Sequence, residues 1–162
     1  MKRIIAISLC LAAVLVLSLG TQARAEKVKA AFVLLATIDD QGWTTTHYNG
    51  IEYLKEQLGD AVEVSYTENV FSPADAERVI RDYAAQGMDI IFTTTFLHMD
   101  PTLTVAMEYP DIKFVHCSGF KSADNMGNYF VRMYQAEYLA GYMSGLMGLK
   151  NVGTVATHPI PE

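Results

Sequence analysis

The chain has 162 residues, of which 51% are hydrophobic, and a formal net charge of −6. This length is sufficient for one domain with a core of its own. Because nucleic-acid phosphates repel an acidic protein, the composition excludes nucleic-acid binding as the main function.

The first segment has the pattern of a secretion signal. Lys2 and Arg3 precede an apolar run over residues 4–19, and Ala23-Arg24-Ala25 supplies the small-residue cleavage pattern. The run is short for a membrane-spanning helix, which needs about 20 apolar residues. We therefore expect residues 1–25 to be removed as a signal peptide, which predicts a periplasmic or extracytoplasmic protein.

Removal of this segment changes the charge and the cysteine content. The segment contains three basic residues and no acidic one, so the formal net charge becomes −9. Cys10 lies inside it, directly after a bulky leucine where a lipidation signal needs a small residue, so no lipoprotein is expected. Cys117 then remains as the only cysteine, which excludes an internal disulfide. We expect it to be a buried, small apolar residue.

Beyond residue 25, strand-like and helix-like stretches alternate. This alternation predicts an α/β fold in which a parallel sheet carries helices on both faces, a three-layer, Rossmann-like arrangement. Strands are predicted at Val28–Ala36, Val62–Asn69, Asp89–Thr95, Ile112–Ser118 and Val152–Thr157, with a shorter one at Asn128–Val131. Helices are predicted at Thr45–Leu58, from the Ser72 cap to Gly87, at Pro101–Glu108, and at Tyr134–Leu149, the last packed on the sheet through its glycines.

The loop after the first predicted strand, Thr37 to Trp43, has the composition of a binding loop. Loops at the carboxyl ends of parallel strands are where such folds bind ligands, and this one carries Asp39, Asp40 and the only Trp. It lacks the glycine spacing of a phosphate-binding loop, and its two carboxylates repel phosphate, so an uncharged polar ligand is favoured. Either carboxylate could instead only cap the helix that follows.

The carboxyl-end loops of all the predicted strands are expected to share one edge of the sheet. They offer Trp43, Phe96 and Phe120 as aromatic platforms, each of which could instead be a packed loop anchor. Such a set suits a flat small molecule with polar edges. The hydrogen-bonding groups expected there are Asp39, Asp40, Thr94, Thr95, His98 and Asn125.

Catalytic patterns are weak. His116 and Cys117 are neighbours on a predicted strand, so their side chains point to opposite faces and cannot pair as base and nucleophile. There is no Gly-x-Ser-x-Gly elbow and no zinc-type spacing. Receiver domains and nucleoside hydrolases also place Asp residues after the first strand, but Thr93-Thr94-Thr95 stands where a receiver needs its acceptor Asp, and the hydrolases use a longer Asp run. We expect no enzymatic activity, no cofactor and no metal.

Several sequence blocks occur in order between Lys27 and the last residue. They are Asp40-Gln41-Gly42-Trp43, Glu68-Asn69-Val70, 75–80 (DAERVI), 85–92 (AQGMDIIF), 99–103 (MDPTL), 111–114 (DIKF) and 158–162 (HPIPE). Together they resemble the basic membrane protein (BMP, PnrA-like) family of solute-binding proteins. These are type I periplasmic binding proteins and include the purine-nucleoside receptors of ABC importers.

The resemblance implies a function and a set of ligand contacts. It implies a solute-binding protein of an ABC import system, with a purine nucleoside or purine base as ligand and the membrane permease as partner. It places Asp40, Trp43, the loop Thr94-Thr95-Phe96 and the turn Gly119-Phe120 against the ligand. Thr44 stands where many relatives have Asn.

The resemblance also implies a domain organisation. Proteins of this family have two similar lobes that clamp the ligand between them. We therefore expect a signal peptide at 1–25, one ligand-binding lobe at 26–157, and at 158–162 the start of the crossover to a second lobe that the chain lacks. Three other interpretations stay open at this point: a ligand sensor that is not coupled to transport, a non-functional truncated fragment, and an enzyme acting on nucleosides.

Overall fold

A computed structural model describes residues 26–156 and contains one five-stranded sheet. All four strand pairings are parallel, and the strand order is β2-β1-β3-β4-β5. The strands are β1 Val28–Val33, β2 Val62–Thr67, β3 Ile90–Thr93, β4 Lys113–Cys117 and β5 Met126–Tyr129. The predicted α/β class and parallel sheet are thus confirmed.

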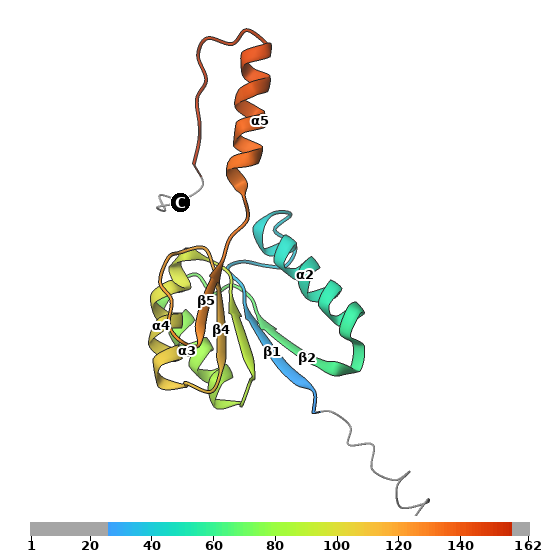
Figure 1. Cartoon of the computed structure of the whole chain (residues 1–162), viewed down its shortest axis with the longest axis vertical. Helices are drawn as coiled ribbons and strands as arrows, with labels where there is room; N and C mark the ends of the chain where they lie inside the picture. Colours follow the sequence, from blue (N-terminus) through green and yellow to red (C-terminus); the bar gives the residue numbers. More distant parts are fainter. Residues whose placement is uncertain (1–25, 157–162) are drawn as a thin grey trace, which may run out of the picture.

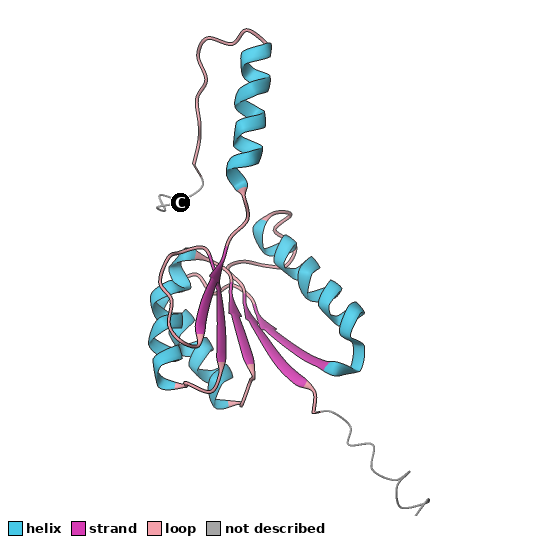
Figure 2. Cartoon of the chain, in the orientation of Figure 1, coloured by secondary structure: helices cyan, strands magenta, loops and turns pink. Residues whose placement is uncertain are grey.

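Helices lie on both faces of the sheet (Figures 1 and 2). The helices are α2 Trp43–Leu58, α3 Pro73–Ala85, α4 Met99–Glu108 and α5 Met133–Leu146, with short 3₁₀ turns η1 Gly59–Ala61 and η2 Phe96–His98. Helices α3 and α4 pack side by side on one face, and α2 lies on the other face next to β2. Ser72 starts α3 as predicted, because its hydroxyl accepts the Asp75 backbone N–H at 3.1 Å.

The core lies between the sheet and helices α3 and α4. Ala31 and Ile91 from the strands pack there with Ile80 of α3 and Val105 of α4, and all are buried. Phe32 and Phe92 point to the opposite face, where their rings stack with centroids 4.5 Å apart and are half-buried. Side chains along a strand alternate between faces. The central strands are therefore buried on the face that carries α3 and α4, whereas Phe32 and Phe92 on the other face remain half-buried.

Cys117 ends β4 inside the domain and is 1% exposed, which confirms its predicted burial. We expect a thiol reagent to modify it at least roughly tenfold more slowly in the folded chain than in urea, because labelling requires local opening. Peptide mass mapping would follow Cys117 separately from Cys10. Fast labelling of the folded chain accompanied by loss of solute binding would instead place the thiol at a ligand site.

The last two predicted elements differ from the structure. Helix α5 does not pack on the sheet: it projects from the end of β5 (Figure 1), and none of its residues is buried. Residues 151–156 have no regular structure, so the strand predicted at Val152–Thr157 is absent over its described part. The small residues of α5 allow close approach of another backbone but do not specify which surface approaches.

Two predicted segments, the signal peptide at 1–25 and the crossover at 158–162, lie outside the described residues. Between residues 26 and 156, no helix combines the length and the apolar character needed to cross a membrane.

Candidate functional site

The loops that follow the strands gather at the carboxyl edge of the sheet, as predicted. We call this edge, residues 34–43, 68–72, 94–98 and 118–120, the rim. Its first two loops are joined directly, since the Leu34 N–H donates to the Thr67 carbonyl at 2.8 Å and the Val70 N–H donates to the Leu34 carbonyl at 3.1 Å. The first loop is therefore held in place by backbone hydrogen bonds.

Asp40 organises the start of helix α2. One carboxylate oxygen accepts the N–H groups of Gly42 at 2.8 Å and Thr45 at 2.9 Å, and the other accepts the Thr44 N–H at 2.9 Å. The Thr45 N–H, together with those of Thr44 and Gly42, holds the pKa of this carboxyl well below its usual range. The capping alternative is thus confirmed for Asp40, and its contact with a ligand stays a prediction. Asp39 beside it is exposed.

Trp43 is the first residue of α2 and is half-buried in the rim. Its indole N–H donates to the Thr94 carbonyl at 2.6 Å, which ties the first loop to the loop after β3. On the same helix, the His47 ring lies with its centroid 4.9 Å from the indole. The Trp43 ring is therefore fixed in position and reaches the surface only in part, as expected of a preformed stacking platform.

The predicted threonines have different environments. Thr44 is 1% exposed, and its hydroxyl accepts the Ala36 N–H at 3.2 Å. Thr94 is also 1% exposed, and its hydroxyl donates to the Val33 carbonyl at 2.9 Å. Both buried side chains therefore hold the loops after β1 and β3 in position and do not reach the surface. Thr95 and Phe96, by contrast, are half-buried and lie at the surface of the rim.

The turn after β4 brings a third aromatic ring to the rim, after those of Trp43 and Phe96. Phe120 is 69% exposed, and its backbone N–H contacts the Met99 sulfur at 3.3 Å. Gly119 has φ +74°, and a Cβ at this position would lie 2.9 Å from the Nε2 of His116. Only glycine fits such a close approach at a positive φ.

Backbone strain is concentrated at the same edge. Three non-glycine residues among those described have a positive φ: Gln41 at 54°, Asn69 at 60° and Ser118 at 75°. Each lies in a different rim loop. Conformations of this kind cost about 1–3 kcal/mol each and are found mainly at functional sites, which supports the rim as the candidate site.

Two residues expected at the rim are not available there. His98 is completely buried, and its Nε2 hydrogen-bonds to the Val70 carbonyl at 2.8 Å. Asn125 lies at the opposite edge, before β5, where its amide donates to the carbonyls of Ala106, Tyr109 and Ile112. The prediction was wrong for Asn125 because it treated the whole loop 119–125 as part of the carboxyl edge, although this loop crosses to the amino end of the next strand.

Three other residues in or next to the rim were not identified from the sequence. The Glu68 carboxylate accepts the Ile38 N–H at 2.7 Å and so supports the first loop. His47 could have been found from its spacing, because residues four apart on a helix are neighbours. Phe130, whose ring centroid is 6.3 Å from that of Trp43, carries no such signal, since it follows a different strand.

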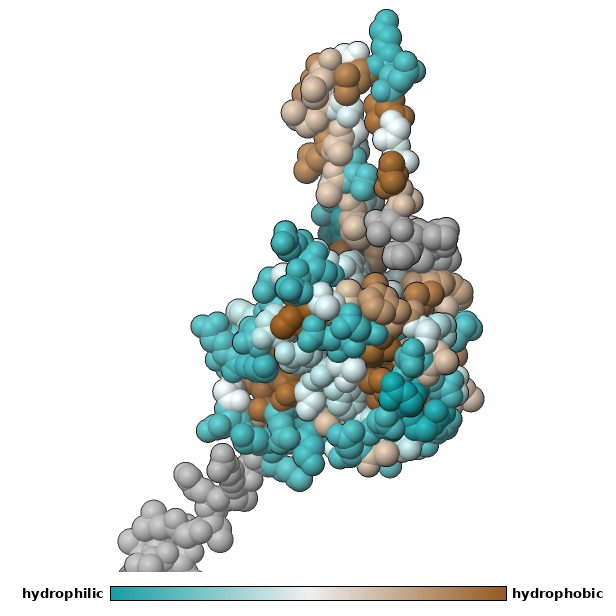
Figure 3. Space-filling model, turned by 180° about the vertical axis from the view of Figure 1, so that it is seen from behind, coloured by the Kyte–Doolittle hydropathy of each residue, from teal (hydrophilic) through white to brown (hydrophobic). Residues whose placement is uncertain are grey.

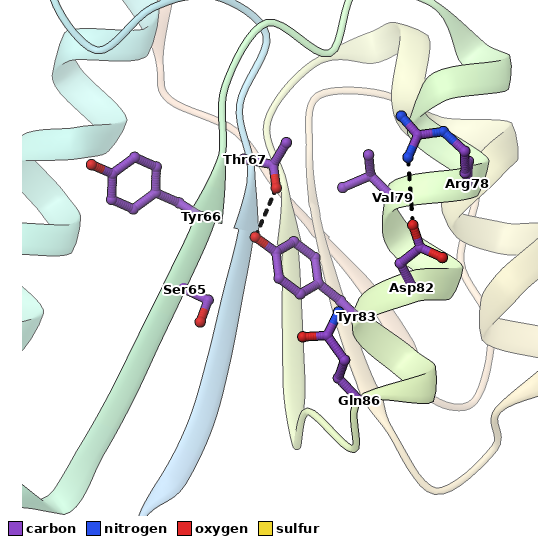
Figure 4. A pocket seen from close by; sticks show the side chains of 8 residues that line it. All are labelled: Ser65, Tyr66, Thr67, Arg78, Val79, Asp82, Tyr83 and Gln86. Atoms are coloured by element: carbon purple, nitrogen blue, oxygen red, sulfur yellow. Dashed lines mark hydrogen bonds and ion pairs between the residues drawn. The ribbon is translucent and has the colours of Figure 1, made fainter.

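A groove of about 490 Å³ lies between β2 and α3 (Figure 4), and no rim residue lines it. Tyr83 crosses it to Thr67, with 2.8 Å between their hydroxyl oxygens, and Arg78 pairs with Asp82 at 3.5 Å. It is open and polar and contains none of the predicted ligand residues. In the described part of the chain, no cluster of three or more His, Cys, Asp or Glu residues could hold a metal ion.

The comparison with protein families gives a match over residues 27–162. The matching model is Bmp, described as ABC transporter substrate-binding protein PnrA-like. It thus covers every element of the fold and all the rim residues.

Individual relatives agree with this match. A purine-binding protein of Brucella abortus is 44% identical over 89% of this chain and 42% of its own length. A Haloferax volcanii protein, provisionally named an ABC transporter glucose-binding protein, is 42% identical over 88% of this chain and 36% of its own. A solved ABC transporter solute-binding protein from Conexibacter woesei superposes with a TM-score of 0.64 at 27% identity, over 73% of this chain and 40% of its own. The chain spans less than half the length of these curated relatives.

Proposed function

The chain belongs to the Bmp family of PnrA-like ABC transporter substrate-binding proteins, and on this basis we propose that it contributes to an extracytoplasmic receptor for purine nucleosides or purine bases. The family is one of binding proteins, not of enzymes. The receptor would deliver its solute to an ABC permease in the membrane, after export by the signal peptide proposed at residues 1–25.

The observation that carries the proposed ligand class is the position of Trp43. Its ring is fixed at the rim by the 2.6 Å hydrogen bond to the Thr94 carbonyl, with Phe96 and Phe120 on neighbouring loops. An aromatic platform with polar backbone and hydroxyl groups beside it suits a flat heterocycle with polar edges. The 44% identity to a purine-binding protein supports the same ligand class.

A sugar is the second candidate ligand. It is favoured by the relative that is provisionally named a glucose-binding protein and is 42% identical. A pyranose also packs on an aromatic face, so Trp43 alone does not separate the two ligands. Titration with adenosine, inosine and glucose under the same conditions decides between them.

We also propose that the ligand is clamped between this rim and a second lobe. The sheet-containing body ends with β5 at Tyr129, and the residues that follow are almost all exposed. This supports a crossover that begins soon after β5, in the segment 130–132, and therefore earlier than the crossover expected at 158–162 from the family resemblance. A single rim leaves one side of a bound solute in water, so affinity without the second lobe should be low.

The test of the proposed function is Trp43→Ala. Loss of one stacked base should weaken binding by about 1–3 kcal/mol, or roughly 5- to 150-fold in Kd. Binding would be measured by isothermal titration calorimetry with adenosine and inosine, in the chain joined to the second half of the 44%-identical relative. Trp43→Phe, which keeps an aromatic face, should lose much less.

The matched control is Tyr53→Ala. Tyr53 is an exposed aromatic residue of the same helix but lies away from the rim. Its removal should leave Kd unchanged. Purine binding by Trp43→Ala as tight as that of the parent would mean that Trp43 only packs the loop, and the proposed site would fail with it.

A further inference from the structure

The chain leaves the body of the domain at a single point, the end of β5. The last backbone bond between the body and this strand is from the Ser118 N–H to the Tyr129 carbonyl, at 3.0 Å. From residue 130 to residue 156, every residue is exposed except the half-buried Ser144. Figure 3 shows apolar side chains over this projecting segment. Few contacts are therefore available to set the direction of α5.

Phe130 makes one of these contacts, and its partner is Trp43. The two ring centroids are 6.3 Å apart and the ring planes are inclined by 46°. The distance lies in the range of favourable aromatic pairs, and the ring planes are tilted between the stacked and the edge-to-face arrangement. Phe130 is 42% exposed, so the remaining part of its ring is free of the body.

Trp43 is a suitable anchor because it is held from two other sides. Its indole N–H donates to the Thr94 carbonyl, and the centroid of the His47 ring lies 4.9 Å from that of the indole. The Tyr138 and Tyr142 rings of α5 stack on each other, so this pair lies within the projecting segment and does not link it to the body. Among the ring pairs of the described residues, the Trp43–Phe130 pair is the one that joins the projecting segment to the body.

We propose that Phe130 is a positioning residue, which packs on Trp43 and thereby fixes the direction in which the chain passes from β5 to α5. The Trp43 ring, which is proposed above as a ligand platform, then has a second role as the fixed contact on which Phe130 packs.

The experiment measures the orientation of α5 without any ligand, so its outcome does not depend on the proposed function. Spin labels would be placed on the exposed Ala85→Cys of α3 and Glu137→Cys of α5, in a full chain carrying Cys10→Ser and Cys117→Ser. Double electron–electron resonance then gives the distance distribution between the body and α5. In Phe130→Ala, the fraction of molecules outside the parent's main distance peak should rise roughly two- to tenfold, the scale of one aromatic pair.

Further variants distinguish loss of the Trp43–Phe130 contact from a nonspecific increase in the mobility of the segment after β5. Trp43→Ala should broaden the distribution as much as Phe130→Ala, and the double variant no more than either, because both remove the same contact. Trp43→Phe and Phe130→Tyr should keep the parent distribution. Tyr134→Ala, which removes an exposed aromatic residue beyond this contact, is the matched control and should also keep it.

Circular dichroism would show that each variant retains the fold. The emission of Trp43, the only tryptophan, should shift to the red in Phe130→Ala as the indole gains contact with water. Unchanged distances in both Phe130→Ala and Trp43→Ala, or equal broadening in Tyr134→Ala, would overturn the proposal. Neither outcome would affect the ligand role of Trp43, which the purine titrations test separately.

Discussion

Gly119→Ala is expected to lower the free energy of unfolding by about 2–5 kcal/mol. A new Cβ would lie 2.7 Å from the Met99 sulfur and 2.9 Å from the Nε2 of His116. The methionine sulfur can move, but the His116 ring is buried and its Nδ1 is 2.8 Å from the Thr93 hydroxyl. The substitution therefore adds steric overlap to the cost of a positive φ in a residue with a Cβ.

Gly87→Ala is the matched control, because it separates these two costs. Gly87 also has φ +74°, but a Cβ there meets nothing within 4 Å. The free energy of unfolding of Gly87→Ala should therefore fall only by the cost of a positive φ in a residue with a Cβ, about 1–2 kcal/mol. Urea unfolding followed by circular dichroism gives both values. Equal losses of stability in the two variants would show that the turn after β4, at residues 119–120, rearranges easily and is not rigidly held.

Much of the fold follows from local patterns in the sequence. Alternation of strand-like and helix-like stretches predicted the parallel sheet, and the Ser72 cap with Pro73 located the start of α3. Helix α5 shows where such patterns fail. Its apolar periodicity predicted a helix within a few residues of its bounds, but the surface that would cover it is not encoded in the helix itself.

The candidate site was predicted at the level of loops and less well at the level of side chains. Parallel topology alone places the loops after β1, β3 and β4 on one edge, and this was confirmed. What sequence cannot give is the partner of each polar group. The partners of Asp40 are local backbone N–H groups, and its capping role was among the alternatives drawn from the sequence, but the Thr94 hydroxyl donates to the Val33 carbonyl on a neighbouring strand. Such long-range partners depend on strand register, which no local pattern specifies.

Acidification between about pH 6.5 and about pH 4 is expected to remove about 3 kcal/mol of stability because of His98. The ring is fully buried, its Nε2 bonds to the Val70 carbonyl, and its Nδ1 has no hydrogen-bond partner among residues 26–156. Burial lowers the pKa of His98 from 6.5 to about 4, and the bond to Val70 opposes this only in part. As the pH falls, the unfolded chain binds the proton first, so the contribution is complete above pH 6.5 and is lost toward pH 4.

His98→Gln tests this assignment, since the amide can still donate to the Val70 carbonyl but does not titrate in this range. Urea unfolding of the parent and the variant would be compared at pH 7.5, 6.0 and 4.5. His47, whose pKa burial also lowers, and the carboxylates are common to both proteins and cancel in the difference. The difference in the free energy of unfolding between the parent and His98→Gln should fall by about 1.4 kcal/mol for each pH unit below 6.5. This value is the free energy of one pKa unit. A difference that stays constant over this range would show that the buried His98 ring accepts a proton without cost and that the loop around Val70 is open to water.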